Sequence, residues 1–133
     1  MQVTRSELVG RPMEFKRSPC PVANTLELVG DKWTLLVIRD LLRGKRTYGE
    51  LLDSPERIPT NILAERLKRL ERAGLITSAA YQERPVRYAY TLTPGGESLR
   101  AVLKAFARWG EEHIPGTRSL AAPARQTKSP ATR

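Results

Sequence analysis

The sequence has few of the residues that carry covalent or metal chemistry. It holds one cysteine, Cys20, and one histidine, His113, far apart along the chain. A lone cysteine excludes an internal disulfide framework, and no Ser/His/Asp set or metal-ligand cluster is evident. No glycine-rich phosphate loop occurs either. We therefore expect no catalytic residues, no metal and no cofactor, and the pattern does not favour an enzyme.

Long apolar segments are also missing. No run of about 18 or more apolar residues occurs, so no transmembrane helix and no membrane partner is expected. The first 21 residues lack the apolar stretch of a secretory signal. Together with the scarcity of cysteine, these features predict a cytoplasmic protein.

Acidic residues are outnumbered by basic ones, mainly near the ends of the chain. The net charge is +9, with +2 in residues 1–19, +4 in residues 115–133 and +3 between them. Basic tails attract nucleic acid without recognising its sequence. The length of 133 residues suits one domain. We expect a flexible arm over 1–19, an ordered domain over 20–114 and a disordered basic tail over 115–133.

The first part of the domain has the pattern of two helices. Pro21 suits the first position of a helix, and Gly30 is expected to end it in a left-handed conformation. Asp31 is the expected N-cap of the next helix, over residues 32–43. That second helix is apolar on most of its circumference, which predicts that it lies at the centre of the core.

Two further helices follow at short intervals. Thr47 and Glu50 have the spacing of a capping box, which predicts a short third helix. Thr60 is the expected cap of a fourth helix over residues 60–73. Leucines recur at helical spacing along this fourth helix and define its buried face.

A hairpin and a last helix complete the domain. Residues 75–82 and 86–92 are expected strands, and polar and apolar residues alternate in the second of them. After Thr93, one helix is expected to run to about Ile114. The fold class is therefore mainly α with a small β-hairpin. It is a winged helix-turn-helix with additional N- and C-terminal helices for dimerisation.

This order of elements predicts that the protein binds double-stranded DNA. An amphipathic helix with a polar face is most often only solvated, but two short helices followed by a hairpin favour a recognition helix that enters the major groove. Asn can pair with adenine, Lys or Arg with guanine, and Glu with cytosine. Arginines at the hairpin tip can contact phosphates or the minor groove. The predicted DNA-binding residues are Thr47, Tyr48, Thr60, Asn61, Glu65, Lys68, Arg69, Arg72, Arg84 and Arg87.

Several stretches together resemble the HxlR-type family of bacterial winged-helix regulators. They are Cys20-Pro21-Val22, Leu26, Gly30, Lys32-Trp33, Tyr48, Glu50-Leu51, Ile58, Leu63, Arg66-Leu67, Leu70-Glu71, Gly74-Leu75-Ile76, Pro85, Arg87, Tyr90, Leu92-Thr93 and Gly96. The resemblance implies a homodimer that binds an inverted-repeat operator and often controls a neighbouring gene of detoxification or redox metabolism. Asp31 departs from the glycine usual at its position, and Ala89 from a commonly charged one.

The last helix independently favours a dimer. Its apolar stripe consists of Leu99, Val102, Leu103, Phe106 and Trp109. The stripe could simply cover its own domain, but the other helices already supply a core. Two-fold operators also need two copies of the recognition helix. We therefore predict that this stripe forms the dimer interface.

Cys20 lies where a thiol could act as a redox switch. It precedes Pro21 at a helix N-terminus, with Lys16 and Arg17 nearby, and such a position stabilises a thiolate. In similar HxlR-type proteins the cysteine at this position can respond to quinones, aldehydes or oxidants, so a small electrophile or aromatic effector is a candidate partner. A small buried residue at the interface is an equally good interpretation.

Three other functions stay open from the sequence. A winged-helix module can bind protein, and a basic protein can bind DNA without sequence preference, although the basic helix and tails favour DNA recognition. A thiol-dependent enzyme is the least favoured, since Cys20 has no identifiable activating partner.

Overall fold

The computed structural model describes residues 17–119 and is mostly helical, with a two-stranded antiparallel hairpin. The predicted arm and tail lie largely outside these residues. In chain order the elements are α2 (Pro21–Val29), α3 (Thr34–Leu42), α4 (Tyr48–Leu52), α5 (Thr60–Arg72), β1 (Ile76–Glu83), β2 (Val86–Leu92), α6 (Pro94–Glu97) and α7 (Arg100–His113). The predicted fold class, a winged helix-turn-helix, is confirmed.

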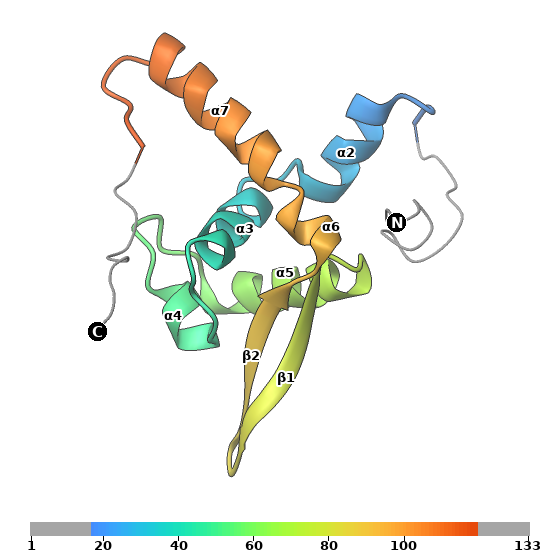
Figure 1. Cartoon of the computed structure of the whole chain (residues 1–133), viewed down its shortest axis with the longest axis vertical. Coiled ribbons are helices and arrows are strands. Elements are labelled where there is room, and N and C mark those ends of the chain that lie inside the picture. The colour runs from blue at the N-terminus through green and yellow to red at the C-terminus, as the bar shows by residue number, and fades with distance from the viewer. Residues whose placement is uncertain (1–16, 120–133) are drawn as a thin grey trace.

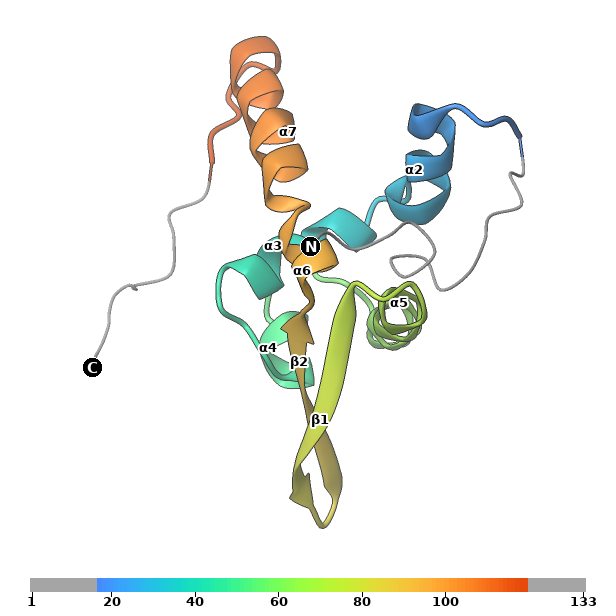
Figure 2. The same cartoon turned by 45° about the vertical axis from the view of Figure 1, so that its right-hand side comes forward.

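The elements are arranged around a small central body (Figure 1). α3, α4 and α5 gather at the centre, and the β1–β2 hairpin extends from them as a wing. α2 and α7 project from the opposite end of the body and diverge from each other, which the second view also shows (Figure 2). The wing and these two helices therefore leave the body in opposite directions.

The core lies between α3, α4, α5 and the base of the wing. Ile38 from α3 and Leu63 from α5 are completely buried. Burial of side chains of this size is the dominant source of stability in a domain this small. The buried cluster consists of Val37, Ile38, Leu41, Leu51, Ile58, Leu63, Leu67, Leu70, Ala73, Leu75 and Ile76.

The capping box and the hairpin are confirmed. The Thr47 hydroxyl accepts a hydrogen bond from the Glu50 amide at 3.2 Å, and the Glu50 carboxylate accepts one from the Thr47 amide at 3.1 Å. In the wing, β1 and β2 pair from Ile76 opposite Leu92 out to Glu83 opposite Val86. A β-bulge interrupts this register between Ala80 and Gln82.

Three predictions about helix ends are wrong. One concerns a backbone conformation, and the other two misplace the start of a helix by one or two residues. Gly30 has a right-handed backbone conformation (φ −82°) and not the left-handed one predicted. A larger residue would not fit here, because its Cβ would lie 2.4 Å from the Leu26 carbonyl oxygen. α3 begins at Thr34, because residues 31–33 form a turn. Thr60 is the first residue of α5, and Pro59 is the cap, because its carbonyl already accepts the first helical bond, from the Leu63 amide.

The expected last helix is broken into two. The Thr93 hydroxyl accepts from the Gly96 amide and caps α6, but the helix is interrupted at residues 98–99 before α7 starts. Gly95 and Gly96 favour a helix weakly. Gly96 also approaches the Leu75 carbonyl so closely that a Cβ would lie 2.2 Å from its oxygen. The break thus accompanies tight packing of α6 on the body.

Asp31 joins the turn before α3 to the side of α5. Its carboxylate accepts from the Trp33 and Thr34 amides at 3.0 and 3.1 Å, and from Arg66 Nε at 2.9 Å. Burial opposes ionisation of Asp31, but hydrogen bonds from Thr34, Arg66 and the Trp33 amide outweigh it, so its pKa lies well below the usual range. The ionised carboxylate therefore stabilises the folded state.

This lowered pKa makes part of the stability depend on pH. A depressed carboxyl pKa contributes stability fully above the pKa of the unfolded chain and loses it as the pH falls. We expect Asp31→Asn to be less stable than the wild type at pH 7, and that gap to narrow by about 1 kcal/mol at pH 3. Urea unfolding at the two pH values measures the gap.

The matched control is Glu97→Gln, which removes a half-exposed carboxylate paired with Arg100 on the surface. Its difference from the wild type should stay near zero at both pH values, since exposed pairs contribute little. A constant gap for Asp31→Asn across the pH range would contradict the assigned pKa direction.

Candidate nucleic-acid interface

α5 presents one polar face to solvent. Asn61, Glu65, Lys68 and Arg72 are all exposed, whereas Leu63, Leu67 and Leu70 on the opposite side are buried. The helical repeat produces this separation, because residues three or four apart share a face. The exposed face combines donors and acceptors suited to base edges with two cations suited to phosphates.

Two arginines on the flank of α5 are bound within the protein. Arg66 pairs with Asp31 and with the neighbouring Glu65. Arg69 Nη2 donates to Asp31 Oδ1 and to the Leu28 carbonyl, both at 3.1 Å. The structure therefore places Arg69 against the end of α2 rather than with the exposed residues of α5.

The starts of α4 and α5 lie side by side. The Tyr48 hydroxyl donates to the Thr60 carbonyl at 2.7 Å, which joins the first residues of the two helices. Thr47 is already fixed one residue earlier by the capping box. Thr47, Tyr48 and Thr60, which lie up to 13 positions apart in the sequence, are thus brought together at the N-terminal end of α5.

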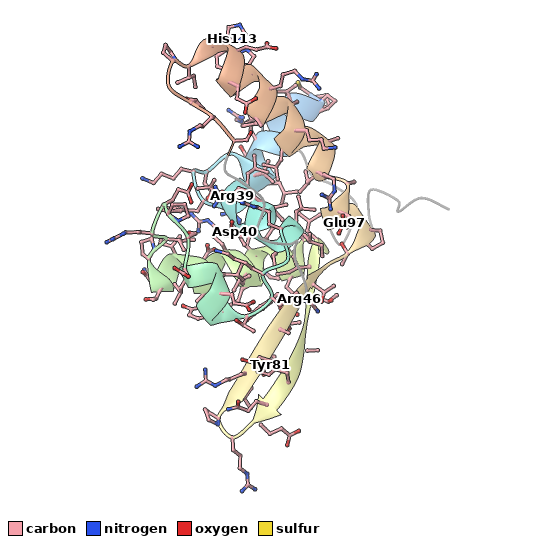
Figure 3. All side chains as sticks on the ribbon, turned by 60° about the vertical axis from the view of Figure 1, so that its left-hand side comes forward. Arg39, Asp40, Arg46, Tyr81, Glu97 and His113 are labelled. Atoms are coloured by element: carbon pink, nitrogen blue, oxygen red, sulfur yellow. The ribbon has the colours of Figure 1, made fainter. Side chains whose placement is uncertain are left out.

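The wing carries two exposed arginines near its tip. Arg84 lies in the turn and Arg87 near the start of β2. Tyr81 lies at the bulge along the wing, and it is half exposed (Figure 3). No ion pair or hydrogen bond engages either arginine guanidinium in the described part of the chain. The two cations are therefore available at the end of a projecting hairpin.

Arg46 attaches the base of the wing to the body, and sequence reasoning missed this role. Its Nε donates to the Tyr90 carbonyl at 3.0 Å and its Nη2 to the Thr91 hydroxyl at 2.8 Å. The Tyr90 amide returns a bond to the Arg46 carbonyl, and Thr47 forms a bridge with Ala89. Figure 3 shows Arg46 where the wing meets the helices. No local sequence signal links residues 44 positions apart.

The apolar stripe of the last helix is divided between two environments. Leu99 and Leu103 pack against the core, and Val102 is partly buried. Phe106 and Trp109, farther along α7, are 61% and 58% exposed. The first part of the stripe therefore covers its own domain, and the second part lies outside the core of the described residues.

α2 also exposes apolar side chains. Val22 is 66% and Leu26 50% exposed, whereas Val29 at the end of the helix is buried. α2 and α7 project from the same end of the body (Figure 1). Exposed large apolar groups gathered on projecting helices are typical of a protein–protein contact.

Cys20 is a free, exposed thiol at the N-terminal boundary of α2. Its amide donates to the Ser18 hydroxyl at 3.2 Å, and its side chain makes no capping bond. Arg17 pairs with Glu27 at 3.2 Å, so the charge expected to act on the thiol already has a partner. Lys16, the other expected cation, lies outside the described residues. Because the Cys20 thiol is exposed, a reactive thiol is favoured over a small residue buried at an interface.

Other chemistry is sparse between residues 17 and 119. His113 stacks on Trp109 at 4.5 Å between ring centroids, at the far end of α7 from the body. In this part of the chain no group of three or more His, Cys, Asp or Glu side chains could hold a metal ion. Nor does any described helix combine the length and apolarity needed to cross a membrane.

Comparison with known proteins supports a DNA-binding regulator. Residues 28–118 match the HxlR-like helix-turn-helix family. A helix-turn-helix transcriptional regulator of Synechocystis sp., sll1512, is 38% identical over 95 residues, which cover 71% of this chain and 70% of the relative.

Two solved structures share the fold. The reduced form of the transcriptional regulator YodB from Bacillus subtilis has a TM-score of 0.61 and 31% identity, covering 75% of this chain and 99% of that one. The redox regulator HypR in its reduced form has a TM-score of 0.66 and 27% identity, covering 72% and 95%. Since the family match spans α3 to α7, including α5 and the β1–β2 hairpin, this chain belongs to the HxlR-like helix-turn-helix family of transcriptional regulators.

Proposed function

We propose that the protein binds an inverted-repeat operator as a homodimer and recognises its sequence through α5. The observation that carries this proposal is the exposed polar face of α5. It accompanies a wing whose two arginine guanidinium groups have no hydrogen bond or ion pair within residues 17–119. A major groove accepts one α-helix, and the N-terminal half of that helix comes nearest the base edges. Asn61 and Glu65 lie in that half.

The exposed residues divide into two roles. Asn61 suits bidentate pairing with adenine, and Lys68 or Arg72 suits guanine or a phosphate. Thr47, Tyr48 and Thr60 lie together at the start of α5, where polar groups contact the DNA backbone and fix the register of the helix. Arg84 and Arg87 at the wing tip add charge for the minor groove or its phosphates.

DNA binding is tested by selecting bound sequences from a random pool and measuring affinity for the selected duplex. We expect an inverted repeat with half-site centres about 10 bp apart, because two-fold related helices enter successive turns of the major groove. Asn61→Ala should lower discrimination at one base pair by about 1–3 kcal/mol. Lys68→Ala should weaken binding and reduce its dependence on salt.

Lys104→Ala serves as the control, since it removes the same charge from an exposed site on α7, away from α5. It should leave operator affinity unchanged. Selection that enriches no motif, with equal affinity for all duplexes, would exclude sequence-specific recognition and favour general DNA binding.

The dimer is proposed to form through the projecting helices. Phe106 and Trp109 on α7, with Val22 and Leu26 on α2, form exposed apolar surfaces at the end of the body opposite the wing. Pairing there buries these surfaces and leaves both copies of α5 free for DNA. Leu99 and Leu103 of the α7 stripe pack against the core of their own domain, so only Phe106 and Trp109 are proposed to contact the partner.

Phe106→Glu should convert the dimer to a folded monomer, because an unpaired carboxylate would be buried in the contact. Light scattering measures the mass, and operator affinity should fall sharply with it. Lys104→Glu, two residues away and outside the stripe, should remain dimeric. If the Phe106→Glu variant stays dimeric, the subunits do not associate through this part of α7.

Cys20 is proposed to act as a regulatory thiol. It is exposed, and it begins the helix that carries Val22 and Leu26. The structural neighbours include a redox regulator and a diamide-treated form of YodB. A thiolate that adds to a quinone forms a thioether, and diamide oxidises two thiols to a disulfide while it is reduced to the hydrazine. Either product adds bulk beside the proposed subunit contact.

Diamide or a benzoquinone should change the operator affinity of the wild type but not of Cys20→Ser. Binding is measured before and after treatment, and mass spectrometry records the modification. Because each chain has one cysteine, any protein disulfide must join two molecules. Equal binding by both proteins after complete modification of Cys20 would assign the thiol no regulatory role.

A further inference from the structure

Among the described residues, α2 packs on the body mainly near its C-terminal end. Val29, its last residue, is buried and Leu28 packs against the core, whereas Val22 and Leu26 toward the other end are exposed. Both views show α2 standing away from α3 and α5 (Figures 1 and 2). The direction in which α2 projects therefore depends on the few contacts at residues 28–31.

Beside the apolar packing of Leu28 and Val29, the polar contacts at residues 28–31 include bonds from α5. Arg69 Nη2 donates to the Leu28 carbonyl and to Asp31 Oδ1, both at 3.1 Å. Arg66, one turn earlier on α5, donates through Nε to Asp31 Oδ2 at 2.9 Å. The Asp31 carboxylate thus links two side chains of α5 to the end of α2, and it simultaneously binds the first amides of α3.

The cluster of Asp31, Arg66 and Arg69 is suited to fix the angle between α2 and α5 and does not serve merely as surface charge. The Asp31 and Arg66 side chains are only 22% and 16% exposed. Ion pairs shielded in this way and supported by several directed hydrogen bonds hold a definite geometry, unlike exposed pairs between mobile side chains. The three elements that meet at Asp31 are the helix with a proposed dimer surface, the central helix and the proposed recognition helix.

We propose that Asp31 is a positioning residue that sets the angle between α2 and α5, and through it the spacing of the half-sites that the dimer accepts. This inference rests on the proposed inverted-repeat dimer. With α2 and α7 at the subunit contact and α5 in the groove, the distance between the two recognition helices depends on how each projecting helix is attached to the body. α7 is attached through Leu99 and Leu103 in the core, and α2 through the angle at Asp31. In this proposal Asp31 acts through α2 and α5 and not through direct contact with DNA or the partner subunit.

The experiment measures the affinity of each variant for a series of selected inverted repeats whose half-site spacing changes in steps of one base pair. The wild type should lose about tenfold or more at two base pairs from its optimum, because each step moves and rotates one half-site. Asp31→Asn keeps the shape but removes the charge. It should bind the whole series within about threefold, because the two recognition helices no longer have a fixed separation.

Arg69→Met is the second variant, because it keeps an apolar stem and leaves the Arg66–Asp31 pair intact. It should also flatten the spacing preference. The control is Asp40→Asn, which neutralises a buried carboxylate of α3 that is paired with Arg39 at 2.9 Å (Figure 3). It should lower stability but preserve the preferred spacing.

The outcomes are distinct. Unchanged spacing preference in folded Asp31→Asn and Arg69→Met would overturn the proposal and leave the inverted-repeat dimer intact. An equal loss at every spacing for Arg69→Met would also overturn it, since that result assigns Arg69 to direct DNA contact. A wild type with no preferred spacing, or one that is monomeric by light scattering, would contradict the proposed dimer itself.

Discussion

Burial of one face of α5 is the constraint on which the rest of the structure depends. Leu63, Leu67 and Leu70 lie within the core with Ile38, so α5 can neither rotate nor tilt without opening a cavity. Because one face is fixed inward, the polar face is fixed outward. The same packing keeps the base of the wing, through Leu75 and Ile76, in a constant relation to that polar face.

Electrostatic contacts complete this frame at two edges where the core does not reach. On one edge, Asp31 connects α5 to the end of α2, and on the other Arg46 connects β2 to the segment before α4. Both are charged groups bound to backbone atoms or to buried partners, and such bonds specify direction more sharply than apolar contact does. The core therefore gives stability, and these two side chains orient the parts that extend from it.

Local signals predicted much of the fold. The capping box at Thr47, the leucine repeat of α5 and the strand predicted from alternation in β2 each have a short-range physical cause, and each is confirmed. The alternation does not produce one buried face along the whole strand, because Val86 and Tyr88 are exposed. The break at residues 98–99 and the roles of Arg46 and Arg69 depend on packing between distant segments. No pattern along the chain reports such contacts. The polar face of α5 was predictable from spacing, but which of its arginines is bound internally was not.

The wing has a mechanical consequence. Near its base β2 bonds both to β1 and to the Arg46–Thr47 segment. Beyond Ala89 the bonds of the described hairpin are its own: the cross-strand pairs, interrupted by the bulge, and those from Gln82 to the turn. We therefore expect the hairpin to be more rigid at its base than at its tip. Amide hydrogen exchange is accordingly expected to slow progressively from Val86 toward Leu92. In the proposed complex with DNA, a tip of this kind would follow grooves of different width, so the wing would supply attraction over many sequences while α5 supplies the selectivity.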